Sequence, residues 1–326
     1  MIYTHFGGKK DVKKKKPVSA GQWGCILFMA LLLSFPGLSI KGAKNGLLLW
    51  YSSVLPALLP FMICTSLLTA LHGVPLIVAP FSPVLKGLMG LSDYGAFALL
   101  GGLLCGYPMG AKNCGDFLRA GLISPREGKT LFAVSSFPSP MFVTGYLALK
   151  ASQAAAPDSV SFWRLAASLY LPAVPLFLLA RKLYGFSREE VKKAAVNHSR
   201  PEGIWGIDQA LSSGVETMVK VGVYLMIFSI AAEFIRNLPL PGQILPAFLV
   251  SLMEMTTGMN FSAVSVKGER GILLILWAGA FGGLSGVFQT ASVIKNAGLS
   301  IRHYVIWKMA HGILACLIFV LLQAGC

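Results

Sequence analysis

The sequence predicts an all-α protein that crosses a membrane several times. Hydrophobic residues make up 55% of the 326-residue chain and charged residues only 13%. The mean hydropathy of +0.68 is too apolar for a soluble domain of this size. A helix needs about 20 apolar residues to cross the hydrocarbon core of a bilayer. Stretches of roughly that length occur at 24–40, 46–71, 162–180, 219–235, 271–284 with its continuation, and 304–322.

The formal net charge of +15 comes from basic residues in loops and in an arm at residues 1–20, before the first apolar stretch. No basic patch with interleaved aromatic residues and no RNA-binding signature accompanies them, so we expect no nucleic-acid partner. The charges follow the positive-inside rule, which predicts a cytoplasmic N-terminal arm. Because the apolar run continues to Ile40 without an Ala-x-Ala-like site, we expect a retained helix at 21–40 rather than a cleaved signal peptide.

The sequence lacks the motifs of the common enzyme and metal sites. Its six cysteines form no C-x-x-C pair, and there is no Walker A loop, nucleophile elbow or H-E-x-x-H. We therefore expect neither an enzyme nor a metal or other cofactor. His303 and His311 lie on one face of the last apolar stretch, where polar helix packing explains them better than metal binding does.

Four apolar stretches are interrupted by residues that break helices. The interruptions are Gly-Tyr-Pro-Met-Gly at 106–110, Ser-Ser-Phe-Pro-Ser-Pro at 135–140, Glu-Met-Thr-Thr-Gly at 254–258, and Gly-Gly-Leu-Ser-Gly at 282–286. An unsatisfied amide in hydrocarbon costs several kcal/mol, so such breaks are tolerated where a protein-lined cavity receives the freed backbone. Broken segments at matching places in two halves indicate a transporter substrate site.

Two halves, at 41–184 and 207–326, repeat the same order of elements around a basic linker at 185–206. Each half has a long span with a polar start, a short broken stretch, a broken helix with a charged start, and an uninterrupted span. The short broken stretch predicts a re-entrant hairpin, so each half crosses the membrane three times. An odd number of crossings requires the second half to be inverted, and it gives seven net crossings with a cytoplasmic linker and an outside C-terminus.

The string Gly-Tyr-Pro-Met-Gly-Ala-Lys at 106–112, followed by Gly-Leu-Ile-Ser at 121–124 and a Ser/Pro-rich break, resembles the nucleoside-recognition, or Gate, domain family. The resemblance covers roughly residues 40–325 and includes the blocks at 254–258 and 281–289. It implies a fold similar to the transport core of concentrative nucleoside transporters. Within the family the chain is most similar to sporulation membrane proteins of endospore-forming bacteria, which are implicated in moving dipicolinate across the outer forespore membrane.

The resemblance therefore implies a multi-pass protein of the cell membrane or outer forespore membrane that transports a small anionic solute, dipicolinate above all. Two other functions stay open. One is a nucleoside-type carrier, and the other is a non-transporting assembly or gating protein required for spore formation. Polar groups facing one another from the four breaks would favour transport, whereas breaks filled by Phe137, Met141 and similar residues would favour the scaffold.

The candidate substrate-binding residues all lie at or beside a break, where free N–H groups and helix dipoles suit a carboxylate and polar side chains add hydrogen bonds. They are Gly106, Tyr107, Gly110, Lys112 and Asn113 at the first break, Ser135, Ser136 and Ser139 at the second, Glu254, Thr257 and Asn260 at the third, and Ser285, Gln289 and Thr290 at the fourth.

Several of these side chains have alternative roles. Lys112 either attracts the anion or extends to the inner membrane surface, and the serines either bind solute or pack helices. Glu254 is an acid within an apolar stretch, so it is costly unless it is used or paired. Three roles are open to it: binding a coupling proton or cation, orienting Thr257 and Asn260, or pairing with Lys112. An interfacial position is the remaining alternative.

Overall fold

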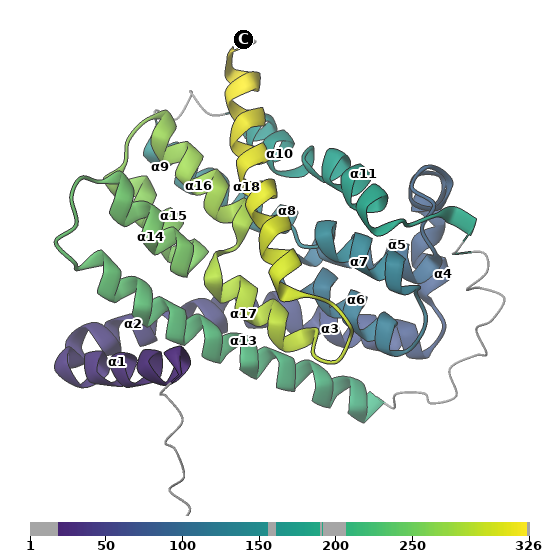
Figure 1. Cartoon of the computed structure of the whole chain (residues 1–326), viewed down its shortest axis with the longest axis horizontal. Helices are drawn as coiled ribbons and strands as arrows, with labels where there is room; N and C mark the ends of the chain where they lie inside the picture. Colours follow the sequence, from purple (N-terminus) through teal and green to yellow (C-terminus); the bar gives the residue numbers. More distant parts are fainter. Residues whose placement is uncertain (1–18, 156–160, 190, 192–206, 325–326) are drawn as a thin grey trace, which may run out of the picture.

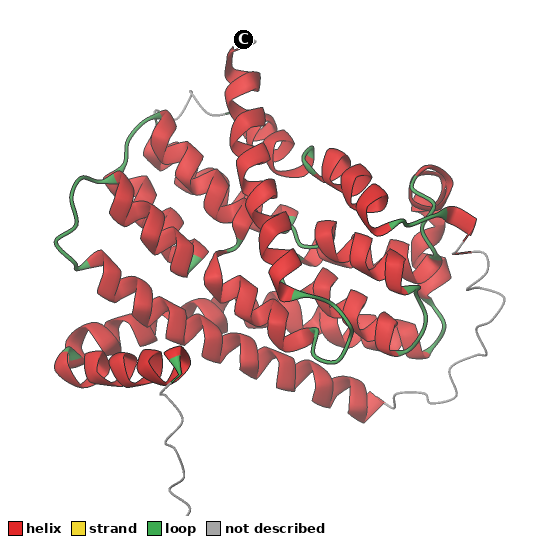
Figure 2. Cartoon of the chain, in the orientation of Figure 1, coloured by secondary structure: helices red, strands yellow, loops and turns green. Residues whose placement is uncertain are grey.

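The computed structural model describes residues 19–155, 161–189, 191 and 207–324, and the expected arm and most of the linker lie outside this part. All the regular structure in the described part is helical, without strands (Figure 2). Five helical stretches are long and apolar enough to cross a membrane: Pro36–Ala70, Phe162–Tyr184, Leu211–Arg236, Glu269–Val293 and Ile301–Ala324. Many large apolar side chains on these and neighbouring helices are exposed, as lipid-facing residues would be.

The first helices differ from the boundaries that hydropathy predicts. Helix α1 (Ala20–Ser34) begins at a Ser19 capping box and ends at Phe35, because Pro36 starts a new helix. Helix α2 (Pro36–Leu49) continues through a π-helical turn (Trp50–Val54) into α3 (Leu55–Ala70). Lys41 thus lies within a helix rather than between the two apolar stretches at 24–40 and 46–71, and its Nζ is 2.6 Å from a carboxylate oxygen of Glu233.

The long helix α13 (Ile207–Arg236) crosses α2 and α3 and forms one side of the molecule (Figure 1). The crossing with α2 is close because Gly42 and Gly46 face it. A Cβ atom on Gly42 would lie 2.6 Å from the Cα of Ile230, and one on Gly46 would lie 2.7 Å from the Cα of Met226. This is the small-xxx-small contact that brings membrane helices together through van der Waals packing.

Two pairs of short helices pack closely against each other. Helix α5 (Asp93–Cys105) is followed, after residues 106–108, by α6 (Met109–Arg119), and α14 (Ile244–Met253) is followed, after the single residue Glu254, by α15 (Met255–Ser265). Each helix has 10–13 residues, too few to cross a bilayer alone. The breaks are narrower than the sequence suggests, since 109–110 and 255–258 are already helical.

Two further helices are broken in the middle. Helix α7 (Pro125–Val134) gives way to five non-helical residues at 135–139, after which α8 (Pro140–Phe142), a π-helical turn (Val143–Leu147) and α9 (Ala148–Ala154) run on continuously. Helix α16 (Glu269–Phe281) is separated from α17 (Gly283–Val293) by Gly282, whose φ of +89° suits a residue without a side chain. The break expected at 282–286 is thus one residue long, rather than five.

The remaining helices close the molecule around these breaks. Helices α4 (Val74–Val78), α10 (Phe162–Tyr170) and α11 (Ala173–Tyr184) lie on the outer side, with a bend at Leu171 and Pro172 that the sequence does not predict. Helix α18 (Ile301–Ala324) is uninterrupted and contacts α7, α10, α16 and α17, so it stands between the two sets of broken helices (Figure 1). Its buried face therefore meets the interior of both halves.

Candidate functional site

A cavity of about 570 Å³ lies where the four interruptions meet. This volume falls in the usual range for small-molecule sites. Each interruption contributes at least one polar side chain to the lining: Tyr107, Ser139, Glu254 with Thr256, and Ser285. The rest of the lining is mostly apolar. It comes from the α2–α3 region, α13, the two short-helix pairs and the two broken helices, and it includes Leu49, Val54, Leu58, Met141, Phe142, Tyr146, Leu225 and Met255.

Tyr107 joins the tip of the α5–α6 pair to the second broken helix. Its Oη lies 2.9 Å from the carbonyl oxygen of Gly279 and 2.8 Å from that of Ala280, so the hydroxyl donates to one or the other. The ring lies against Gly282, where a Cβ atom would be only 3.1 Å from Cε1 of Tyr107. The neighbouring Gly106 also lines the cavity, and its φ of +85° requires glycine.

The three serines of the first broken helix have different surroundings. Ser139 lines the cavity and caps the helix after it, since its Oγ accepts a hydrogen bond from Phe142 N at 3.2 Å. Ser135 is fully buried, with Oγ 3.6 Å from Cys114 Sγ. Ser136 Oγ is buried and has no hydrogen-bond partner in the described part of the chain. Phe137 packs into the core rather than filling the break.

Glu254 is 1% exposed and acts as the N-cap of α15. Its two carboxylate oxygens accept from Thr256 N at 3.1 Å and from Thr257 N at 2.7 Å, and both threonine hydroxyls donate to it as well. Of Thr257 and Asn260, which Glu254 was expected to orient, it contacts Thr257 alone. These donors satisfy the carboxylate without a cation, so the expected pair with Lys112 is not formed.

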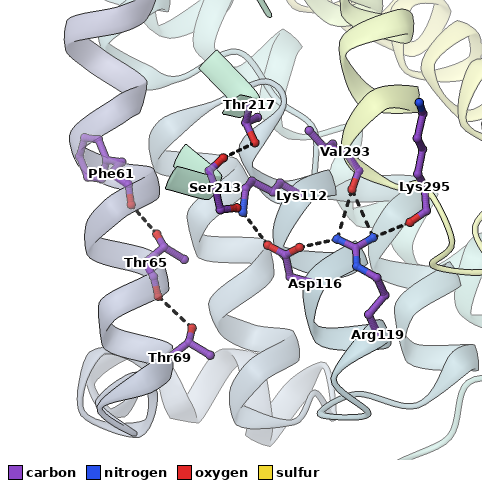
Figure 3. Close-up of polar contacts among 10 residues, drawn as sticks. All are labelled: Phe61, Thr65, Thr69, Lys112, Asp116, Arg119, Ser213, Thr217, Val293 and Lys295. Carbon is purple, nitrogen blue, oxygen red and sulfur yellow. Dashed lines mark hydrogen bonds and ion pairs between the residues drawn. The ribbon is translucent and has the colours of Figure 1, made fainter. Parts of the chain in front are cut away.

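Lys112, Asn113 and Gly110 lie on α6, outside the cavity lining. Lys112 Nζ is 2.6 Å from Asp116 Oδ2, and Asp116 also pairs with Arg119 (Figure 3). Arg119 in turn donates to the carbonyl of Lys295 at 2.7 Å, so this charged row ties α6 to the end of α17. Gly110 packs against the Ser135 carbonyl, and Asn113 is 2% exposed with Nδ2 unpartnered among the described residues.

At the second broken helix, Ser285 and Gln289 line the cavity and Thr290 does not. Gln289 Nε2 donates to Ser285 Oγ at 2.9 Å, which leaves the Ser285 hydroxyl hydrogen available to a solute. No side chain caps the N-terminus of α17, so N–H groups of its first turn face the same region. Thr290 is fully buried, and Asn260 lies outside the cavity lining, one turn along α15 from Thr256, where its Oδ1 accepts from Lys150 at 2.8 Å.

The sequence identified His311 as a polar packing residue but not its buried neighbour on α18, Lys308. Lys308 is 1% exposed, and its Nζ lies 2.6 Å from Tyr107 Oη, 2.7 Å from the Ser136 carbonyl and 3.2 Å from His311 Nδ1. The other ring nitrogen of His311 lies 2.8 Å from the carbonyl of Leu169. The position of Lys308 in the middle of an apolar span could have indicated it, because a charge in a membrane span is costly unless it is paired or functional.

Comparison with known proteins fits this arrangement. No family model matches the chain, and no solved structure matches it significantly. The sporulation integral membrane protein YlbJ of Bacillus subtilis (strain 168) is 24% identical over 335 aligned positions, which cover 91% of this chain and 80% of YlbJ. This chain is a distant homologue of YlbJ. It is therefore a multi-pass integral membrane protein related to a sporulation protein, as the resemblance predicted, and its Gate-domain assignment stays a prediction.

Proposed function

We propose that this YlbJ homologue transports a small anionic solute, with dipicolinate as the first candidate, across the outer forespore membrane. The observation that carries this proposal is the cavity into which each of the four interruptions contributes a polar side chain: Tyr107, Ser139, Glu254 and Ser285. Convergence of broken helices on one cavity is how secondary transporters build their binding sites. The protein would act as a carrier rather than as an enzyme.

The proposed architecture is two inverted repeats, each with a re-entrant hairpin formed by α5–α6 or α14–α15. Corresponding contacts support it. In the first half a Cβ on Gly106 would lie 3.0 Å from Ser139 N, and in the second a Cβ on Gly283 would lie 3.1 Å from Met255 N, so each pair's tip meets the break of its own half.

Contacts between the halves correspond in the same way. Tyr107, at the first tip, contacts the carbonyls of the second broken helix, while Tyr146, in the first broken helix, donates to the Thr256 carbonyl at the second tip, over 2.8 Å. With these repeats, the topology we propose has the N-terminus and the linker in the cytoplasm and seven net crossings.

An anionic solute suits the charges around the cavity. The uncapped N-terminus of α17 presents N–H groups and the positive end of its dipole, beside the free hydroxyl hydrogen of Ser285. Lys308 adds a positive charge directly behind Tyr107. The carboxylate of Glu254 is already bound by its own helix, so its charge is partly offset. Phe142 and Met255 supply apolar walls for a flat ring.

Glu254 is also the residue we propose for any coupled proton or cation, because its carboxylate is buried and lines the cavity. Two other functions compete with dipicolinate transport. The Ser285–Gln289 pair would also suit a nucleoside, since it offers both donors and acceptors. The largely apolar lining, including Met141 and Phe142, would suit a scaffold that moves no solute.

Uptake by proteoliposomes separates these functions. The purified full chain is reconstituted and offered labelled dipicolinate, then labelled uridine, with protein-free vesicles of the same lipids as the control. We expect dipicolinate to accumulate above the control and an excess of unlabelled uridine to leave its rate unchanged. Accumulation of uridine but not dipicolinate would favour the nucleoside carrier, and accumulation of neither would favour the scaffold.

A further inference from the structure

The ammonium group of Lys308 is held by electron-rich atoms from three places in the fold. Its neighbours are the phenol oxygen of Tyr107 at the tip of α5–α6, the carbonyl of Ser136 in the break at 135–139, and Nδ1 of His311 on α18 itself. In the described part of the chain, no carboxylate oxygen lies within 4.0 Å of Nζ. The charge is therefore stabilised by dipoles rather than by an acid.

This environment resembles the coordination shell of a small cation. Ser136 lies in the non-helical segment 135–139, so its carbonyl has left the helical ladder and needs another partner. Carbonyl and hydroxyl oxygens are the ligands that hard cations take, and unwound backbone carbonyls serve this purpose in transporters. Here the ammonium group of Lys308 takes the place of a free cation. The ring of Tyr107 adds a cation–π contact, with its centroid 4.6 Å from Nζ.

The same ammonium fixes how the two broken helices are joined. Because Lys308 donates to Tyr107 Oη, the hydroxyl hydrogen of Tyr107 must point elsewhere, toward the carbonyl of Gly279 or Ala280 in α16. One charge thus connects the break at 135–139, the tip of α5–α6 and helix α16, which leads to the break at Gly282. Losing it would leave the Ser136 carbonyl without a donor and the Tyr107 hydroxyl without its orientation.

We propose that Lys308 is a tethered cation: it fills, from within the chain, a site at the helix break of residues 135–139 that a free monovalent cation or an alkylammonium ion would otherwise occupy. Truncation of its side chain should therefore open a binding site for such an ion. This inference rests on the contacts of Lys308 alone and holds whatever solute the protein moves.

Cation-dependent unfolding of the purified full chain in detergent tests the proposal. Wild type, Lys308→Ala and Lys308→Met are heated in choline, sodium or propylammonium chloride at one ionic strength. Propylammonium replaces the atoms that Lys308→Ala removes, whereas choline has no N–H donor. In choline both variants should unfold about 2–8 °C below wild type, because the Ser136 carbonyl loses its donor.

The rescue distinguishes a cation site from simple packing. Propylammonium or sodium should raise the unfolding midpoint of Lys308→Ala and leave that of Lys308→Met unchanged, because the methionine side chain fills the same space. Absence of any rescue of Lys308→Ala would overturn the proposal. If Lys308→Ala gives no folded protein, Lys308→Met decides: a midpoint below wild type supports the tethered cation, and a midpoint equal to wild type overturns it.

Discussion

Replacing Gly282 by alanine should destabilise the protein more than its backbone conformation alone would require. Gly282 has a φ of +89°, and an L-residue held in the left-handed region costs about 1–2 kcal/mol. In addition, the new Cβ would lie 3.1 Å from Cε1 of Tyr107. Hydrogen bonds hold that ring in place, so moving it weakens at least one of them, at about 0.5–1.5 kcal/mol. We expect a total loss of about 1.5–3.5 kcal/mol.

Gly242 provides the matched control for this substitution. Its φ is +68°, but a Cβ atom added there would meet no heavy atom within 4 Å, so Gly242→Ala should lose only the backbone contribution. The assay is thermal unfolding of the purified chains in one detergent. Gly282→Ala should unfold at a temperature roughly 2–4 °C below Gly242→Ala. Equal unfolding midpoints for the two variants would refute the close contact between Tyr107 and Gly282.

Two further substitutions test other parts of the fold by the same assay. Glu254→Gln should lower stability by about 1–3 kcal/mol, because the two backbone N–H groups of Thr256 and Thr257 bond different carboxylate oxygens and the NH2 group that replaces one of these oxygens cannot accept. An unchanged midpoint would argue against the N-cap. Gly46→Ala should cost about 1–3 kcal/mol by forcing α2 away from α13, whereas Gly37→Ala, with open space around it, should cost nothing. Similar behaviour of the two glycine variants would rule out the close crossing.

The sequence predicts the helical class and the location of the breaks because both depend on local composition. Glycine and proline interrupt an apolar run wherever they stand, and all four expected interruptions contain a helix break. The extent of each break was overestimated. Met255 and Gly258 are helical because Glu254 is the N-cap of α15, which begins at the next residue. This role depends on the rotamer of the Glu254 side chain.

The membership of the site was harder to predict because it depends on which face of a helix meets the cavity. Lys112 comes shortly after the first tip, yet a single helical turn is enough to direct it toward Asp116 instead. Lys308 comes from the far end of the chain, and only the packing of α18 against both broken helices brings it behind Tyr107. No local sequence pattern indicates the contact between Lys308 and Tyr107, which are 201 residues apart.

The most direct test of the cavity as a solute path is to fill it without disturbing the fold. Gly286 lines the cavity, and a Cβ atom there would meet nothing within 4 Å, so Gly286→Phe projects a ring into the space. Gly37→Phe is the control, since Gly37 is also helical with open space around it but does not line the cavity.

The measurement is the initial rate of labelled dipicolinate uptake by proteoliposomes that carry wild type or either variant at matched protein content. We predict that Gly286→Phe reduces uptake to the level of protein-free vesicles, with an unfolding midpoint close to that of wild type. Gly37→Phe should transport at the wild-type rate. A folded Gly286→Phe protein that takes up dipicolinate as fast as wild type would contradict the assignment of this cavity as the transport site.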